Sequence, residues 1–123
     1  MSTVYIAMPD RHLLVNSDGT LSLSPSELVH FVRPSADMLF KSVAASYGDR
    51  AIAVVLTGTG TDGAMGAQTI KKMGGKVIVQ DEETAEFSGM PSAALKATDV
   101  DFVLPLEEIA TCLIALVTQG DAK

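Results

Sequence analysis

Two short runs of aliphatic residues constrain the fold of this chain more than any other feature. Residues 51–56 read Ala-Ile-Ala-Val-Val-Leu and residues 76–80 read Lys-Val-Ile-Val-Gln, and neither run alternates with polar residues. Strands of this kind are typical of a parallel sheet that is covered on both faces. A glycine-rich turn and a helix-compatible segment ending at Gly74 and Gly75 separate the two runs. This strand–helix–strand order predicts an α/β fold.

The remaining segments extend the same alternation of strands and helices. We predict strands at 4–8 and 101–104, a hairpin formed by 12–15 and 21–24, and helices over 36–47, around 92–96 and from Pro105 onward. Ser35 is a candidate N-cap of the first helix, and Gly48 is its candidate stop. Pro105 is expected at the first position of the last helix. The expected architecture is a three-layer α/β/α domain with a partial, doubly wound, mostly parallel sheet and a small β-hairpin near the N-terminus.

Composition excludes several classes of protein. The 123 residues carry a net charge of −6 with a pI near 4.7, which argues against binding to nucleic acid or anionic lipid. The longest apolar stretches are too short to cross a bilayer, so we expect no membrane insertion. The single cysteine cannot form an internal disulfide and suits a reducing cytoplasm.

The loop of residues 58–63 is the segment best suited to chemistry. It reads Gly-Thr-Gly-Thr-Asp-Gly and joins a predicted strand to a predicted helix, at the edge of the sheet where α/β proteins bind ligands. Its glycines allow a sharp turn with exposed N–H groups, which can hold a phosphate or an oxyanion. By spacing alone, Gly58-x-Gly60-x-x-Gly63, with Asp81 after the next strand, also matches a dinucleotide-binding fingerprint.

Asp62 weakens the nucleotide interpretation, because a carboxylate in this loop would repel a pyrophosphate. The dipole of the following helix stabilises the charged form of such a carboxylate by about 0.3–1 kcal/mol. A charged aspartate is suited to orient a histidine and to stabilise its imidazolium form. The sequence leaves open the alternative that Asp62 only caps the helix.

Five ordered motifs extend over nearly the whole chain. They are Val-Tyr-Ile-Ala at 4–7, Pro-Asp-Arg-His at 9–12, Arg-Pro-Ser at 33–35 with Asp37, Leu-Thr-Gly-Thr-Gly-Thr-Asp-Gly at 56–63, and Gly-Met-Pro at 89–91. This set resembles the catalytic domain of the chemotactic protein-glutamate methylesterases of the CheB type. The resemblance covers the C-terminal portion of that domain over residues 1–123, without the receiver domain that commonly precedes it.

The resemblance implies a Ser-His-Asp hydrolase that cleaves glutamyl methyl esters, and in some members deamidates glutamine, on the cytoplasmic helices of chemoreceptors. Asp62 matches the aspartate of the triad, and Thr59 and Gly60 match positions beside the oxyanion and the substrate. Thr59 departs from the family, which usually has methionine there, so the local shape of the pocket is in doubt. Met90 is expected to flank the active-site cleft. No cofactor or metal ion is expected.

The nucleophile and the base of this family lie in segments that no part of the chain resembles. His12 belongs to a motif other than that of the triad histidine, and His30 lies in a stretch expected to be solvated. The serines outside the cleft are expected to act as helix caps or to lack an exposed elbow: Ser35, Ser42, Ser46, Ser88 and Ser92. Because triad residues act as a unit, we expect the chain to be close to inactive alone.

Three hypotheses of function follow. The leading one is that the chain is part of a methylesterase. Missing strands would then leave a sheet edge or an apolar face exposed, so we expect the chain to self-associate or to pair with a complementing N-terminal half. The second is a binding or scaffold module that keeps the fold without catalysis. The third is nucleotide binding through Gly58, Gly60 and Gly63.

Overall fold

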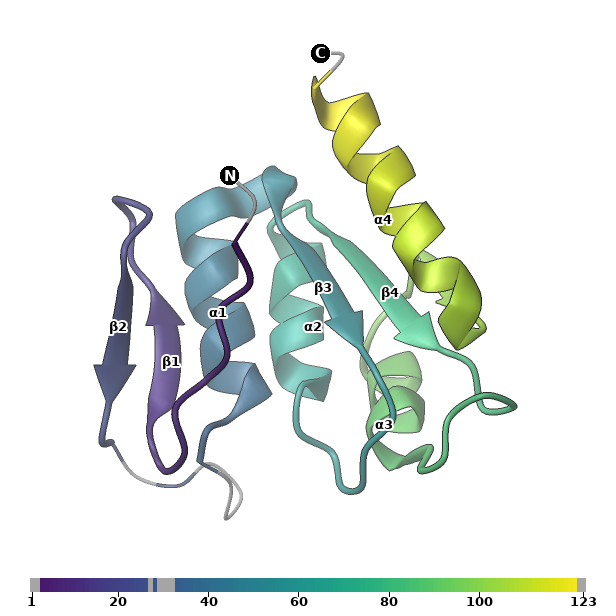
Figure 1. Ribbon diagram of the computed structural model, residues 1–123, viewed down its shortest axis with the longest axis horizontal. Coiled ribbons are helices and arrows are strands. Elements are labelled where there is room, and N and C mark those ends of the chain that lie inside the picture. Colours follow the sequence, from purple (N-terminus) through teal and green to yellow (C-terminus); the bar gives the residue numbers. More distant parts are fainter. Residues whose placement is uncertain (1–2, 27, 29–32, 122–123) are drawn as a thin grey trace.

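The computed structural model describes residues 3–26, 28 and 33–121. Two strands form a hairpin near the N-terminus, and helices then alternate with the strands of a second sheet (Figure 1). In chain order the elements are β1 (His12–Val15), β2 (Leu21–Ser24), α1 (Ala36–Tyr47), η1 (Gly48–Arg50), β3 (Ile52–Val55), α2 (Ala64–Lys72), β4 (Lys76–Gln80), α3 (Gly89–Ala97), β5 (Phe102–Leu104) and α4 (Leu106–Asp121).

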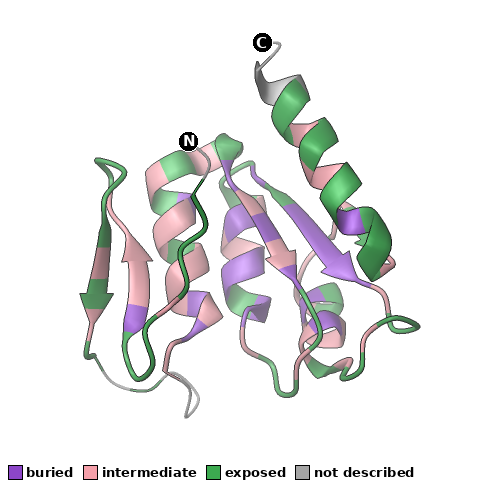
Figure 2. Ribbon diagram, in the orientation of Figure 1, coloured by how far each residue is buried: buried purple, intermediate pink, exposed green. Residues whose placement is uncertain are grey.

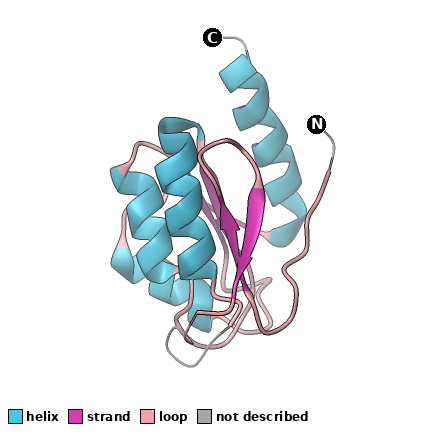
Figure 3. Cartoon of the chain, turned by 90° about the vertical axis from the view of Figure 1, so that its left-hand side faces the viewer, coloured by secondary structure: helices cyan, strands magenta, loops and turns pink. Residues whose placement is uncertain are grey.

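The main sheet has the order β3-β4-β5, and all its strands are parallel. Helices α1, α2 and α3 lie on one side of this sheet and α4 lies on the other, which gives three layers (Figure 3). The hairpin of β1 and β2 is antiparallel and packs against α1. The predicted α/β architecture with a small hairpin is therefore confirmed.

Burial explains the two aliphatic runs. Val77, Ile78 and Val79 of the central strand β4 have no exposed surface, so both faces of this strand are covered (Figure 2). In β3, by contrast, only alternate residues are buried. The difference arises because β3 lies at an edge of the sheet, where one face is covered less completely.

The hairpin turn depends on one glycine. Gly19 adopts φ 86°, and the amide of Asn16 donates to the carbonyl of Thr20 at 2.8 Å across the turn. Asp18 does not share this conformation, because Asp10 is the one non-glycine residue with positive φ in the described part of the chain. Asp18 instead accepts hydrogen bonds from the hydroxyl and the amide of Thr20, which lower the pKa of its carboxyl group.

The predicted strand at 4–8 is absent. This segment has no regular secondary structure, and Val4 and Ile6 are each 90% exposed. It lies on the same side of the sheet as α4 (Figure 3). No neighbouring strand in the described ranges bonds to it, so its strand-forming residues have no partner to pair with.

Two expected helix starts differ, and the third, at Ser35, is confirmed in place but not in its capping bond. Helix α4 begins at Leu106, one residue after Pro105, whose carbonyl accepts the amide of Glu108 at 2.9 Å. Ser92 lies inside α3, and its hydroxyl donates to Glu82 at 3.3 Å instead of capping the helix. Ser35 stands at the N-cap position of α1 but makes no side-chain capping bond of its own, because that role passes to Asp62.

Candidate functional site

The loop of residues 58–63 lies where the sequence places it, between β3 and α2 at the carboxyl edge of the parallel sheet (Figure 1). Gly60 and Gly63 adopt φ values of 84° and 95°, in the region that side chains with a Cβ atom disfavour. These two glycines therefore let the chain reverse direction and enter α2 within a few residues.

Buried polar contacts fix the start of the loop. The amide of Thr57 donates to Oε1 of Gln80 at 2.8 Å, and Gln80 is only 1% exposed. The amide of Gly58 donates to the carbonyl of Phe87 at 2.9 Å, and the carbonyl of Gly58 accepts the amide of Met90 at 2.9 Å. The loop is thus bound to the end of β4 and to the first turn of α3.

Met90 packs directly on this loop. A Cβ atom added to Gly58 would lie 2.5 Å from Sδ of Met90, and one added to Gly89 would lie 3.0 Å from the amide nitrogen of Gly60. A side chain at Gly89 would push α3 away from the loop, whereas one at Gly58 would displace the flexible side chain of Met90. Gly89 is therefore needed for the close approach of the two segments, and Met90 forms one wall beside the loop.

Asp62 is held by the N-terminus of α1 and not by the helix that follows it. Its Oδ2 accepts the amide of Ala36 at 2.6 Å, and its Oδ1 accepts the hydroxyl of Ser35 at 2.8 Å and the amide of Asp37 at 3.2 Å. Sequence reasoning considered a cap on α2 alone. The cap on α1 was missed because it joins residues about 25 positions apart.

A second carboxylate completes a reciprocal arrangement. Asp37, in the first turn of α1 and 3% exposed, accepts the amide of Gly66 in the first turn of α2 at 2.7 Å. Asp62, which precedes α2, thus caps α1, and Asp37, in the first turn of α1, accepts an amide at the start of α2. Gly66 permits this contact, because a Cβ atom there would lie 2.6 Å from Cβ of Phe40.

Comparison with known proteins places this geometry in a family. Residues 1–113 match the model of the CheB methylesterase family. This chain belongs to the CheB methylesterase family. Four of the five motifs that carried the resemblance lie around the loop of residues 58–63 or in the segments that hold it, at residues 9–12, 33–35, 56–63 and 89–91.

Individual relatives agree with this assignment. A putative protein-glutamate methylesterase/protein-glutamine glutaminase of Leptospira interrogans is 50% identical over 113 residues, which are 92% of this chain and 58% of the relative. The protein-glutamate methylesterase/protein-glutamine glutaminase 2 of Methanosarcina mazei is 45% identical over 94% of this chain and 33% of the relative. The crystal structure of the Thermotoga maritima CheB methylesterase catalytic domain superposes with a TM-score of 0.88 at 39% identity and is covered to 61%. The chain therefore spans about three-fifths or less of these relatives.

Ser35 binds Asp62 directly, and His12 binds the backbone of Ser35. His12 is fully buried, and its Nδ1 accepts the backbone amide of Ser35 at 3.1 Å. The Ser35 hydroxyl donates to Asp62, so the imidazole is not the group that receives this hydroxyl proton. His30 lies outside the described residues. Ser42 and Ser46 join α1 to the backbone of β1 at Val15.

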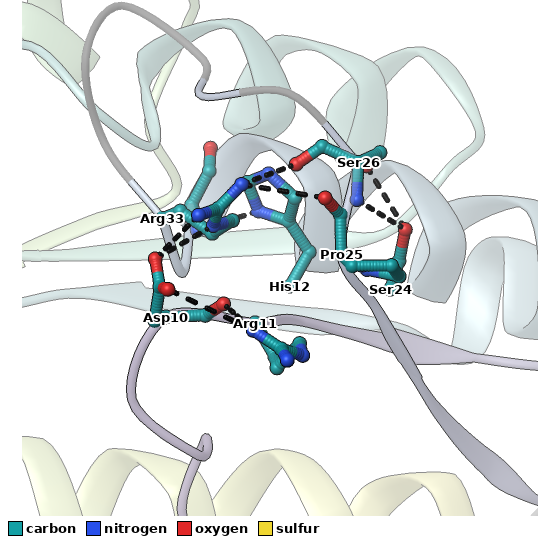
Figure 4. A network of polar contacts seen from close by, with 8 residues as sticks. Asp10, Arg11, His12, Ser24, Pro25, Ser26 and Arg33 are labelled. Atoms are coloured by element: carbon teal, nitrogen blue, oxygen red, sulfur yellow. Dashed lines mark hydrogen bonds and ion pairs between the residues drawn. The ribbon is translucent and has the colours of Figure 1, made fainter.

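Arg33 braces the segment that leads into α1. Its guanidinium contacts Oδ1 of Asp10 at 2.6 and 2.8 Å, and it donates to the carbonyls of Pro25 and Ser26 at 3.3 and 3.1 Å (Figure 4). The carboxylate of Asp37, which is close to Arg33 in the sequence, accepts the amide of Gly66 in α2 instead of pairing with Arg33. Arg33 therefore fixes the loop and the hairpin that carry His12 and Ser35.

Residues 3–26, 28 and 33–121 gather no three His, Cys, Asp or Glu side chains in a way that could hold a metal ion. None of its helices is long and apolar enough to span a bilayer.

Proposed function

We propose that this chain contributes the orienting aspartate of a serine hydrolase site that cleaves glutamyl methyl esters, and deamidates glutamine, on the cytoplasmic helices of chemoreceptors in chemotaxis. The observation that carries the proposal is the placement of Asp62 at the carboxyl edge of the sheet, with three donors bound to it. A carboxylate has about four acceptor positions. One position therefore remains, on Oδ2, where an imidazole N–H can bind.

The loop also offers donors for a developing oxyanion. Thr59 and Gly60 are exposed, and within the described ranges their amides donate to no protein acceptor. Backbone amides directed at the oxygen of a tetrahedral intermediate are the usual means of stabilising it. We assign Thr59 and Gly60 to this neighbourhood, and Met90, which packs on Gly58, to the wall of the cleft.

The chemistry needs two further groups. A serine hydroxyl attacks the ester carbonyl while a histidine takes its proton and then passes it to the leaving methoxide, and Asp62 stabilises the imidazolium formed between these steps. We infer that this serine and histidine come from a segment outside residues 1–123. On this view the chain by itself is close to inactive, and the complete enzyme works in the cytoplasm.

The surface supports pairing with such a segment. One edge of β3 has no partner strand among the described residues, and the apolar side chains of Val4 and Ile6 are each 90% exposed. An unpaired strand edge and an apolar patch both favour association with another polypeptide. We infer that a complementing half, or failing that a second copy of the chain, covers this surface.

A second candidate function is a scaffold module without catalysis. It is favoured by the fact that Asp62 already has a structural task as the cap of α1. Nucleotide binding is a weaker third candidate, since the carboxylate of Asp62 lies in the loop that would have to hold the phosphates. Calorimetric titration with NAD and ATP distinguishes it, because the methylesterase proposal predicts no binding heat.

Reconstitution tests the proposal. The chain is mixed with the part of the Leptospira relative that it does not match, and hydrolysis of a glutamyl methyl ester peptide is followed. We expect activity only in the mixture, and a loss of about 10²–10⁴-fold in kcat with Asp62→Ala. Asp101→Asn is the matched control, because Asp101 is also hydrogen-bonded but lies at the amino edge of the sheet. Absence of activity in the wild-type mixture would favour the scaffold function.

A further inference from the structure

Of the three donors to Asp62, Ser35 is the one that donates through its side chain, so this bond depends on the identity of the residue. The other two donors are backbone amides of Ala36 and Asp37, which any sequence would supply at this helix start. The Ser35 hydroxyl binds Oδ1 at 2.8 Å, whereas the Asp37 amide binds the same oxygen at 3.2 Å. The hydroxyl is therefore the shorter of the two contacts that fix Oδ1.

Ser35 itself is held firmly. It is 2% exposed, and its amide donates to Nδ1 of the fully buried His12. Two residues earlier, Arg33 binds Asp10 and the carbonyls of Pro25 and Ser26 (Figure 4). The backbone that carries the hydroxyl is thus held by contacts of Ser35 and of the segment before it, and the hydroxyl already binds Asp62.

We propose that Ser35 is a positioning residue that occupies Oδ1 of Asp62 and so leaves a single open acceptor, on Oδ2, for an incoming imidazole N–H. This inference rests on the proposed function. Without the hydroxyl, Oδ1 keeps only the longer bond from Asp37, so the carboxylate is held less firmly against rotation about Cβ–Cγ. An imidazole N–H could then bind at an open position on either Oδ1 or Oδ2. A smaller fraction of the bound imidazole would be oriented correctly for proton transfer.

The kinetic test uses the reconstituted esterase. Ser35→Ala is expected to lower kcat roughly three- to tenfold, which corresponds to the net worth of one hydrogen bond, with KM unchanged. Ser35→Thr keeps a hydroxyl and should restore kcat. The matched control is Ser46→Ala, which removes a hydroxyl from the same helix, where it donates to Val15 at 3.0 Å, and should leave kcat unchanged. An unchanged kcat in Ser35→Ala, or an effect on KM alone, would overturn the proposal.

A structural test on the chain alone separates this inference from the proposed function. Crystal structures should show one orientation of the Asp62 carboxylate in the wild type and in Ser35→Thr, and a rotated or divided orientation in Ser35→Ala. If the wild-type mixture has no esterase activity, the proposed function fails, and this comparison still decides whether Ser35 orients Asp62. The same orientation in all three proteins would refute the positioning role.

Discussion

The position of Asp62 could be predicted from the local sequence, but its hydrogen-bond donors could not. Its place after a strand and within a glycine-rich turn predicted a charged side chain at the carboxyl edge of the sheet. Its actual donors, in the first turn of α1, could not be inferred, because no local pattern reports a contact between residues 26 positions apart. The same limit concealed the bond between Asp37 and Gly66.

Removal of the Asp62 side chain should weaken α1 as well as any catalysis. Asp62→Ala leaves two backbone amides of α1 without their acceptor and should lower the free energy of unfolding by about 0.5–2 kcal/mol, as the loss of an N-cap does. Asp62→Asn retains an acceptor oxygen and should cost less. Urea unfolding measures both, with Asp99→Ala at an exposed position as the control. Equal stability of Asp62→Ala and the wild type would mean that the cap contributes nothing.

The helices and strands were predictable because their patterns are local. The aliphatic runs gave β3 and β4, and the spacing of apolar residues gave α1. The prediction of a strand at 4–8 was wrong, because a strand needs a partner strand and the propensity of its residues does not show whether one is present. Pro105 and Ser92 were misplaced by small distances, because helix ends depend on contacts with neighbouring segments such as Glu82.

The contact of α1 with α2 depends on a glycine. Gly66→Ala would place a Cβ atom 2.6 Å from Cβ of Phe40 and 3.0 Å from Cα of Asp37. We expect a loss of about 1–3 kcal/mol in the free energy of unfolding, because the two helices must move apart. Met65→Ala, on the same helix at a side chain that is 52% exposed, serves as the control. A Gly66→Ala variant as stable as this control would show that the helices can separate without cost.

Asp101 joins α2, β4 and the start of β5, and it should make stability depend on acid pH. Burial raises the pKa of its carboxyl group, but the amide of Val77 and the ammonium groups of Lys71 and Lys76 outweigh this, so that its pKa is lowered on folding. A lowered pKa contributes stability above the unfolded-state pKa, and this contribution is lost as the pH falls through the folded-state pKa.

Unfolding of the wild type and of Asp101→Asn from pH 7 to pH 3 measures this contribution. The wild type should be more stable at pH 7, by roughly 1 kcal/mol or less. The difference should shrink as the pH falls below about 4, near the ordinary pKa of an aspartate. A difference that is constant with pH would contradict a role for the charge.

At the scale of the molecule, the apolar surface near the N-terminus is the main feature that the fold leaves unexplained. Val4 and Ile6 are exposed beside a sheet whose β3 edge has no partner in the described ranges. Composition alone gave no sign of this, because the overall hydrophobic content of 47% is ordinary for a globular protein. The resemblance to a longer domain predicted an exposed edge or apolar face, and the burial of each residue shows that Val4 and Ile6 belong to it.

Light scattering after size exclusion should detect association through this surface. We expect the wild type to self-associate, or to form a stoichiometric complex with the complementing half. Val4→Lys with Ile6→Lys should weaken either interaction at least tenfold, because charged side chains oppose burial. Met73→Lys is the control, since Met73 is 49% exposed at the end of α2, on the other side of the sheet. A monomeric wild type with no affinity for the complementing half would count against the proposed interface.

The central claim is that Asp62 orients a histidine contributed from outside residues 1–123. A crystal structure of the chain bound to the complementing half tests this claim most directly, through the distance from Oδ2 of Asp62 to the nearest imidazole nitrogen. We predict a distance of about 2.6–3.2 Å, with the donors from Ser35 and Ala36 still in place. An imidazole bound elsewhere, with Asp62 still acting only as the cap of α1, would contradict the account.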